Sequence, residues 1–286
     1  MRVIANRGTL IEVALPTAAF VPQSSFLGEG TFGRVHRCGD YAVKELGPLA
    51  MANRHVGDFL VEGVRHPCLV SVLGSWCSMW RGGVVMPYVG EENLLSSAQG
   101  AGLSCSVALR AAADVGQGLL HLHAQALVHS DVKPDNVQWR PQRAQAMLLD
   151  YGSTRLRGAP CSRAGTLVWA APEAGCRHIA LPSLDAWAAG LLSQWLGRIL
   201  HQPAKWSAVP VLLDEAKQLL TQHEPRLRCL PDACALWEQG RGERMREQLP
   251  SVALRLERGL TQSPSFLPAY LTWTDLSPTS ASPRRA

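Results

Sequence analysis

A short polar loop, His129-Ser-Asp131-Val-Lys133-Pro-Asp-Asn136, constrains this chain more than any other feature. It follows a long apolar stretch with helical spacing, from Leu103 to Leu122, and precedes the apolar run Met147–Leu149. Asp150-Tyr-Gly152 comes fourteen residues after the loop ends. Phosphoryl transfer to a hydroxyl needs a carboxylate that accepts the proton, a cation near the phosphoryl group and oxygen ligands for magnesium. The two segments supply all these groups, with the glycine predicted to give the backbone freedom to aim Asp150 inward.

A glycine-rich segment, Leu27-Gly28-Glu29-Gly30-Thr31-Phe32-Gly33-Arg34-Val35, predicts a phosphate-binding turn. Glycines allow backbone N–H groups to approach phosphate oxygens, because no Cβ stands in the way. A dinucleotide-binding fold requires a helix at the last glycine. Here a second short strand, Tyr41-Ala42-Val43-Lys44, follows instead and predicts an antiparallel hairpin. Lys44 is then the cation that reaches the phosphates; the alternative, a solvated surface lysine, is disfavoured by the apolar residues before it.

Composition limits the class of protein. The 286 residues carry a net charge of +5, with 47% hydrophobic and 18% charged residues, which predicts a globular, mildly basic chain. No Lys/Arg block is long enough to indicate a nucleic-acid-binding tail. Eight cysteines without a Cys-x-x-Cys pair predict scattered small hydrophobic residues in a reducing compartment. The absence of a signal peptide and of a long apolar run predicts an intracellular protein with no membrane span.

The apolar pattern changes along the chain and predicts two parts. Up to Val84-Val-Met86 the runs are short and strand-like, whereas helical spacing dominates from Leu103 onward. Trp187, Leu191, Leu192 and Trp195 share a predicted helical stripe, and 211–220 predicts another helix. We expect an N-terminal extension, a small domain, a large domain and a C-terminal extension that is disordered from Ser277, with the boundaries 1–24, 25–89, 90–240 and 241–286.

The order of these motifs resembles that of eukaryotic-type protein kinases, from Leu27 to Trp237. Gly165-Thr-Leu-Val-Trp-Ala-Ala-Pro-Glu173 resembles the end of the family's activation segment. Asp185-Ala-Trp-Ala-Ala-Gly190 resembles the buried helix whose aspartate holds the catalytic loop, and Glu224-Pro-Arg-Leu-Arg228 the segment whose arginine pairs with the Glu173 position. The resemblance implies an α+β, bilobal protein-kinase-like fold with a small strand-rich N-terminal lobe and a larger, mainly helical C-terminal lobe.

The resemblance also implies roles for single residues. Asp131 is expected to be the catalytic base, Lys133 to neutralise the γ-phosphate of ATP, and Asn136 and Asp150 to hold Mg²⁺. Lys44 is expected to pair with the α- and β-phosphates. The hinge carbonyl of Pro87 and N–H of Val89 are expected to recognise adenine, and a proline removes only an N–H that this contact does not use. The implied nucleotide site comprises Leu27, Gly28, Glu29, Gly30, Thr31, Phe32, Gly33, Arg34, Val35, Ala42, Lys44, the gatekeeper Met86 and Val89.

The catalytic loop indicates the substrate class. Lys133 followed by Pro134 resembles serine/threonine kinases, and Thr166 lies where that class bridges the catalytic Asp and Lys. We therefore expect protein substrates with Ser/Thr acceptors and no nucleic-acid partner, while the oligomeric state stays open. The compact small domain is similar to that of compact viral kinases. The expected location is the cytoplasm or nucleus, in a host cell if the chain is viral.

Several positions depart from the family pattern. Ser130 replaces the arginine that commonly binds a phosphorylated activation segment, so we predict activity without such a phosphate. Gln138 stands where an apolar residue normally lies beneath adenine, and a buried amide there needs a partner. The acid that pairs with Lys44 is predicted to be Glu62, with Asp58 on the same predicted helical face as the alternative; His66-Pro67 shortens that helix.

Two other functions stay open at this point. The departures at Ser130 and Gln138 allow a catalytically weak or inactive kinase-shaped binding module. A small-molecule phosphotransferase shares the catalytic loop but is disfavoured, because Thr166 and Ala171-Pro172-Glu173 shape a groove for polypeptide in the family.

Overall fold

Five strands of the N-terminal part form an antiparallel sheet. In the computed structural model these strands run in the order β3-β4-β5-β7-β6. Their bounds are β3 Phe26–Gly30, β4 Gly33–Cys38, β5 Tyr41–Leu46, β6 Gly74–Cys77 and β7 Gly82–Pro87. The structure describes residues 2–5, 9–12, 26–47, 57–77, 82–99, 102–161, 166–174, 179–200 and 208–241. All of these belong to the first of two units into which the chain divides, residues 1–243 and 244–286.

The register of this sheet assigns its two faces. Ala42 lies opposite Met86, and Lys44 lies opposite both Val35 and Val84. Opposed residues and every second residue along a strand share a face, so this set lines one side of the sheet. On the other side Val43 and Val85 are completely buried and form a small apolar cluster. The pairing of β4 with β5 confirms the predicted hairpin.

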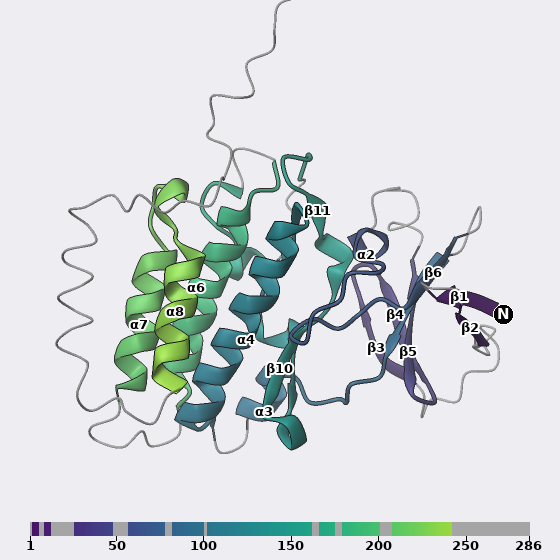
Figure 1. Cartoon of the computed structure of the whole chain (residues 1–286), viewed down its shortest axis with the longest axis horizontal. Helices are drawn as coiled ribbons and strands as arrows, with labels where there is room; N and C mark the ends of the chain where they lie inside the picture. Colours follow the sequence, from purple (N-terminus) through teal and green to yellow (C-terminus); the bar gives the residue numbers. More distant parts are fainter. Residues whose placement is uncertain are drawn as a thin grey trace, which may run out of the picture. The chain divides into compact units, whose positions relative to one another are not determined.

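A second, two-stranded sheet precedes the first. Strands β1 Arg2–Ala5 and β2 Thr9–Glu12 pair antiparallel, and β1 lies beside β6 (Figure 1). Edge strands expose unpaired backbone groups, which proteins commonly cover. The sequence predicted an extension over residues 1–24, and neither of these two strands was identified there. The predicted C-terminal extension and disordered end lie outside the described residues, except for Arg241.

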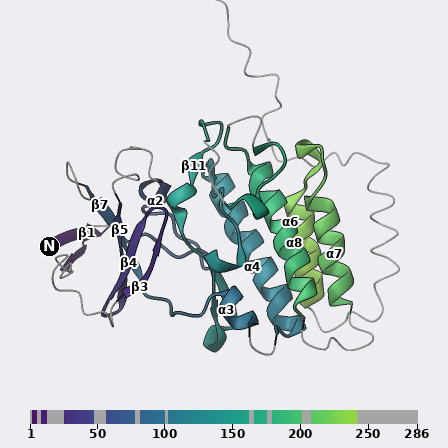
Figure 2. The same cartoon turned by 180° about the vertical axis from the view of Figure 1, so that it is seen from behind.

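The C-terminal part is built mainly from helices, of which four lie side by side (Figure 2). Helix α4 was predicted from its spacing and begins after Ser104, whose hydroxyl accepts the N–H of Val107 at 3.3 Å. It packs against α6 and α8, and α7 packs against both of these. Gly116 of α4 permits this, because a Cβ there would lie 2.5 Å from the Cys234 sulfur. The bounds are α3 Leu94–Ala98, α4 Cys105–Ala124, α6 Pro182–Arg198, α7 Val209–Leu220 and α8 Leu230–Arg241.

Helix α6 was predicted correctly, but its buried face was not. Of the predicted stripe only Leu192 is buried, while Trp187, Leu191 and Trp195 are partly exposed. The buried face instead includes Leu184, Ala188 and Leu196. The helix contacts α4 and α7, and its tightest face carries small and aliphatic residues. The bulkier tryptophans therefore lie beside that face.

Short elements connect the helices and carry the polar loop. Strand β9 pairs with β10, and β8 pairs with β11, both antiparallel. The predicted strand at 147–149 is β10, which ends at Leu148. The bounds are β8 Leu127–Val128, η2 Pro134–Asn136, β9 Val137–Arg140, η3 Pro141–Arg143, β10 Gln145–Leu148, η4 Tyr151–Ser153, β11 Arg155–Leu156, η5 Leu167–Trp169 and η6 Pro225–Leu227.

A turn after the short helix α2 Gly57–Leu60 joins the two parts. The N–H of Leu148 donates to the carbonyl of Cys68, and the N–H of Val70 donates to the carbonyl of Leu148, both at 2.9 Å. Gly118 of α4 lies against this turn, since a Cβ there would be 2.9 Å from Leu69. The turn is therefore fixed to the helical part by backbone hydrogen bonds.

Two absences hold for the part of the chain that the structure describes. No helix within the described ranges has the length and apolar character needed to cross a membrane. No disulfide links the seven cysteines that the structure describes, and Cys176 lies outside those ranges.

Candidate active site

A cavity of about 670 Å³ lies between the strand-rich and the helical parts. Its walls include Ala42, Lys44 and Met86 from the sheet and Asn136 and Asp150 from beyond α4. Ligand pockets typically span about 300–1,000 Å³, so this volume suits a nucleotide. Groups far apart in the sequence thus meet at one cavity.

The predicted nucleotide residues lie at this cavity with two exceptions. All except Thr31 and Arg34 line it, and so do Lys133, Asn136 and Asp150. Arg34 instead forms an exposed ion pair with Glu29, with Nε and Oε1 3.1 Å apart. Asp131 lines a smaller neighbouring cavity.

The glycines of the β3–β4 turn are present for different reasons. Gly33 has φ 150°, and a Cβ there would lie 1.9 Å from the carbonyl oxygen of Glu45, so the fold itself requires glycine. A Cβ at Gly28 or Gly30 would meet nothing within 4 Å. The protein leaves open space beside these two residues, as an approaching phosphate requires.

Lys44 lies between two carboxylates. Its Nζ is 2.8 Å from Asp58 Oδ2 and 2.7 Å from Asp150 Oδ1, and Lys44 itself is only 5% exposed. Burial lowers the pKa of Lys44, but the two carboxylates outweigh burial and the pKa is raised. Burial raises the pKa of Asp58, whereas Lys44 outweighs burial at Asp150 and lowers that pKa. Lys44 is therefore a buried, permanently charged group, and not a surface lysine.

The prediction that Glu62 pairs with Lys44 is wrong. Helix α2 ends at Leu60, so Asp58 and Glu62 do not share a helical face. Glu62 forms a β-bridge with Val72, and its carboxylate accepts a hydrogen bond from the Ser75 hydroxyl. The helix is too short to carry an acid as far along as residue 62, and the alternative weighed from the sequence, Asp58, makes the contact.

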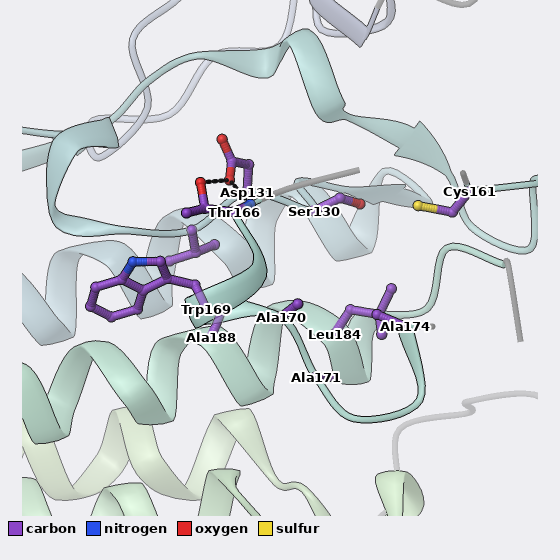
Figure 3. Close-up of a pocket in the computed structure, with 11 residues that line it drawn as sticks. Ser130, Asp131, Cys161, Thr166, Trp169, Ala170, Ala171, Ala174, Leu184 and Ala188 are labelled. Atoms are coloured by element: carbon purple, nitrogen blue, oxygen red, sulfur yellow. Dashed lines mark hydrogen bonds between the residues drawn. The ribbon is translucent and has the colours of Figure 1, made fainter. Parts of the chain in front are cut away.

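The catalytic loop gathers four polar side chains. Lys133 Nζ donates to Asp131 Oδ2 at 2.9 Å and to Thr166 Oγ1 at 2.8 Å. Thr166 donates to Asp131 Oδ1 from its N–H at 3.0 Å, and its hydroxyl lies 3.2 Å from the same atom (Figure 3). Asn136 Nδ2 donates to the Asp131 carbonyl at 2.8 Å and to Oδ2 at 3.1 Å. The predicted Thr166 bridge between Asp131 and Lys133 is confirmed.

Asp185 of α6 holds the start of this loop. Its carboxylate accepts the N–H groups of His129 and Ser130 at 2.8 and 2.7 Å and contacts His123 Nε2 at 2.9 Å. Ser130 has φ 67°, a left-handed conformation that costs a non-glycine residue about 1–3 kcal/mol. Asp185 holds the backbone of the loop, as the resemblance implied, and its two hydrogen bonds offset the strain at Ser130. Sequence reasoning missed His123, because nothing in the spacing connects it with residue 185.

The backbone at Asp150 differs from its prediction. Asp150 itself adopts φ 65°, whereas Gly152 does not have a positive φ. Gly152 is needed for another reason, since a Cβ there would lie 2.4 Å from the Phe32 ring. The glycine therefore admits the side chain of the β3–β4 turn and does not aim the carboxylate. Tyr151 is buried, and its hydroxyl donates to the carbonyls of Val70 and Leu148 at 2.8 and 3.1 Å.

The space beside Ser130 is small. A cavity of about 30 Å³ lies between Ser130, Cys161 and α6 (Figure 3). Cys161 packs with Val128 and Ala180 in an apolar cluster. The activation segment is also held by its backbone, since Arg157 N–H donates to the Ala126 carbonyl at 2.7 Å and Gly158 N–H to the Ala180 carbonyl at 2.8 Å. These contacts need no phosphate.

Two hydroxyl-bearing residues at the start of this segment, Ser153 and Thr154, are buried, whereas Thr166 near its end is exposed and binds Lys133 and Asp131. Ser153 is 2% exposed and Thr154 is completely buried, while Ser162 lies outside the described residues. The buried position of the first two is consistent with the prediction of activity without a phosphorylated segment.

Gln138 has the partner that a buried amide requires. Its Nε2 donates to the Glu92 carbonyl at 2.6 Å, and the residue is 5% exposed while still lining the large cavity. The amide is thereby turned toward the segment after the hinge, and its burial does not leave its donor unsatisfied.

An ion pair closes the activation segment. Arg228 binds both carboxylate oxygens of Glu173, with Nη2 3.0 Å from Oε2, and stacks over the Trp187 ring at 4.8 Å. Its Nη1 also donates to the Ser183 carbonyl at 3.0 Å. The predicted pairing of Arg228 with Glu173 is confirmed.

The donor set fits a magnesium ion. The Lys44 contact uses Asp150 Oδ1, and Asn136 donates through Nδ2, so Asp150 Oδ2 and Asn136 Oδ1 make no hydrogen bond in the part of the chain described. Mg²⁺ binds hard oxygen ligands, commonly one or two from protein together with phosphate and water. Asp150 and Asn136 are the residues that would hold it.

Comparison with known proteins agrees with this geometry. A protein-family model described as "Protein kinase domain" matches residues 22–200. Serine/threonine-protein kinase SBK2 of Mus musculus is 39% identical over 100 residues, which are 32% of this chain and 27% of that protein.

Two viral proteins are also similar. Serine/threonine-protein kinase 1 of Lymantria dispar multicapsid nuclear polyhedrosis virus is 38% identical over 71 residues, 25% of this chain and 26% of that protein. The protein of the same name from Orgyia pseudotsugata multicapsid polyhedrosis virus is 31% identical over 149 residues, 51% of this chain and 54% of that protein. The mouse and Lymantria alignments thus span about a quarter of each relative's length.

Proposed function

Because the chain belongs to the protein kinase family, we propose that it transfers the γ-phosphate of ATP to serine or threonine hydroxyls of protein substrates. One observation carries the proposal. Lys44, Asn136 and Asp150 meet at one cavity, and Asp131 joins them through the hydrogen bonds of Asn136. Cations, carboxylates and an amide oxygen in this arrangement serve the positioning and charge stabilisation on which phosphoryl transfer depends.

Asp131 is the proposed proton acceptor. Oδ1 is held by Thr166 and Oδ2 by Lys133 and Asn136, so the carboxylate has a fixed orientation toward an acceptor hydroxyl. A positioned base contributes about 10²–10⁴-fold to a rate. Lys133 lies within reach of both the base and the cavity and is proposed to neutralise charge on the γ-phosphate.

Lys44 is proposed to bind the α- and β-phosphates. Its ammonium is shared between Asp58 and Asp150. Magnesium held by Asp150 and Asn136 would neutralise phosphate charge when bound. Asp58 would then keep Lys44 directed at the nucleotide, since a charge-assisted hydrogen bond fixes its position.

The base of ATP is proposed to lie between the sheet and the hinge. Val35 and Ala42 supply apolar contacts on the sheet face, while Met86 and Val89 line the same cavity. Gln138 is compatible with this arrangement, because its amide already donates to the Glu92 carbonyl.

A second candidate is an inactive kinase-shaped binding module, and Ser130 is the observation that favours it. The packing of Cys161 and the backbone hydrogen bonds around Gly158 support transfer instead, because they hold the activation segment without an arginine.

The test is transfer of labelled γ-phosphate from ATP to a basic protein in the presence of magnesium. We expect incorporation by the natural chain and a loss of about 10²–10⁴-fold for Asp131→Asn. Phosphoamino-acid analysis should find phosphoserine or phosphothreonine. Equal incorporation by both proteins would overturn the assignment, and thermal stabilisation by Mg-ATP without any transfer would favour the binding module.

A further inference from the structure

We infer that Gly57 is a positioning residue for Lys44: its missing side chain lets helix α2 lie close enough for Asp58, a short acid, to reach the lysine. The effect on the rate of phosphoryl transfer rests on the proposed function. The underlying contact between Lys44 and Asp58 does not, and it can be measured without catalysis.

The first observation is the closeness of two backbones at Gly57. A Cβ on this residue would lie 2.0 Å from the carbonyl oxygen of Tyr151 and 2.5 Å from both the nitrogen and the oxygen of Thr154. Figure 1 shows α2 beside this part of the chain, near β11. No side chain fits into such a gap, so any residue other than glycine would push α2 away from Tyr151.

The second observation is that the opposing wall cannot yield. The Tyr151 ring is buried, with its hydroxyl fixed by the carbonyls of Val70 and Leu148. The Tyr151 carbonyl already accepts the N–H of Thr154 at 2.9 Å. Immediately beyond, β11 pairs with β8. A methyl group at residue 57 must therefore displace α2 and not its neighbour.

The third observation concerns reach. Asp58 is completely buried, and its Oδ2 meets Lys44 Nζ at 2.8 Å. Lys44 cannot follow a retreating partner, because its other contact is Asp150 Oδ1 at 2.7 Å and its own backbone belongs to the central strand β5. A glutamate is longer by one carbon–carbon bond, about 1.5 Å. The longer acid suits a helix placed farther away, and the shorter acid suits the present position.

This interpretation explains why a glycine, Gly57, directly precedes Asp58 at the start of α2. Glycine is a poor helix former, and it stands at the first position of a four-residue helix. Such a residue weakens α2 locally. Its presence is accounted for if the helix must approach Tyr151 so that Asp58 reaches Lys44.

The experiment compares Gly57→Ala, Asp58→Glu and the double variant Gly57→Ala/Asp58→Glu. The chain contains only four lysines, Lys44, Lys133, Lys205 and Lys217. Acetylation of each can therefore be followed by mass spectrometry in the full chain, with Lys217 of α7 as the internal reference. The matched control is Gly197→Ala in α6, where the nearest atom to a Cβ is 3.8 Å away.

We expect Gly57→Ala to raise acetylation of Lys44 several-fold relative to Lys217 and to lower kcat/KM for phosphoryl transfer at least about tenfold, the value of 1.4 kcal/mol. The double variant should recover most of both, since the longer acid spans the wider gap. Gly197→Ala should match the natural chain. Thermal unfolding of every variant checks that the fold is kept.

Two results would overturn the inference. One is unchanged Lys44 acetylation in Gly57→Ala. The other is a double variant as impaired as Gly57→Ala, which would make the glycine a requirement of folding alone. If the natural chain transfers no phosphate while Lys44 acetylation still follows the expected order, the proposed function fails and the positioning role stands.

Discussion

The catalytic loop and helix α2 each hold a carboxylate against a lysine, Asp131 against Lys133 and Asp58 against Lys44. In the loop, hydrogen bonds fix the pair: Thr166 and Asn136 bind the carboxylate, and Asp185 holds the backbone. At α2 the position of the acid depends on a close approach of two backbones at Gly57. One pair is fixed by polar partners and the other by the absence of a side chain.

This difference determines what a sequence can disclose. A hydrogen-bond network is made of residues whose chemistry is visible in the sequence, so its members can be predicted from their type and order. A close approach of two backbones requires only that a Cβ be missing. Because this chain has 25 glycines, the sequence does not indicate which of them allows such an approach. The family resemblance implied the roles of Thr166 and Asp185 in the polar network, whereas the partner of Lys44 was predicted wrongly.

The largest effect is expected when the support of the catalytic loop is removed. Asp185→Asn replaces one carboxylate oxygen by an NH₂ group that cannot accept the N–H of His129 or Ser130. Each buried N–H left without an acceptor costs about 1–3 kcal/mol. Displacement of Asp131 by about 1 Å can reduce the rate about 100-fold. We therefore expect kcat to fall about 100-fold and the free energy of unfolding to fall as well, measured by transfer assays and denaturant titration.

A suitable control for this prediction is Asp214→Asn on the exposed side of α7, where the carboxylate accepts a hydrogen bond from Gln218. It should leave kcat unchanged. If the kcat of Asp185→Asn equalled that of the natural chain, the catalytic loop would be held by its own hydrogen bonds alone.

Much of the fold was accessible to sequence reasoning because periodicity and motif order carry it. The spacing from Leu103 predicted α4, and the two runs ending at Val35 and Lys44 predicted a hairpin. The β1–β2 hairpin was missed, since four-residue strands give too little alternation to detect. In α6 the helix was predicted, but its buried face depends on which neighbours pack against it.

The candidate site was predicted where function depends on residue type and missed where it depends on contact. Gly152 was assigned conformational freedom, yet it makes room for Phe32. Likewise the partner of Gln138 is a backbone carbonyl, at Glu92, which no side-chain pattern reveals. These contacts join segments that are distant in sequence, and only the folded chain defines them.

A smaller effect is expected when the acids near α2 are compared directly. Asp58→Asn removes one of two anions that hold Lys44, and a charge-assisted hydrogen bond contributes about 1.5–3 kcal/mol. We expect kcat/KM to fall about 10- to 100-fold. Without the Asp58 charge the pKa of Lys44 also falls, because burial, which lowers it, is opposed by one carboxylate fewer.

The matched control is Glu62→Gln, the same change four residues later. Glu62 contacts Ser75 and not Lys44, so steady-state kinetics should find kcat/KM within about threefold of the natural chain, a change below 1 kcal/mol. If Glu62→Gln impaired transfer more than Asp58→Asn, the assignment of Asp58 as the partner of Lys44 would be wrong in solution.

The smallest effect concerns the joint between the two parts, where the His66 and His121 rings stack with centroids 4.8 Å apart. Burial lowers the pKa of His66, His121 lowers it further, and Asp114, itself paired with Arg110, raises it. The unfolded chain therefore binds a proton at His66 more readily, and stability rises with pH between the lowered pKa and the ordinary value near 6.5.

Protonation of His66 would also cost the hydrogen bond that its Nδ1 accepts from Cys68 N–H at 3.2 Å. We expect the Tm to increase over this pH range by less than the ~2–4 °C that 1 kcal/mol produces in a domain of this size. His66→Gln should flatten the increase in thermal unfolding scans, whereas His223→Gln at an exposed position should keep it; an equal slope in both variants would assign the pH dependence to other groups.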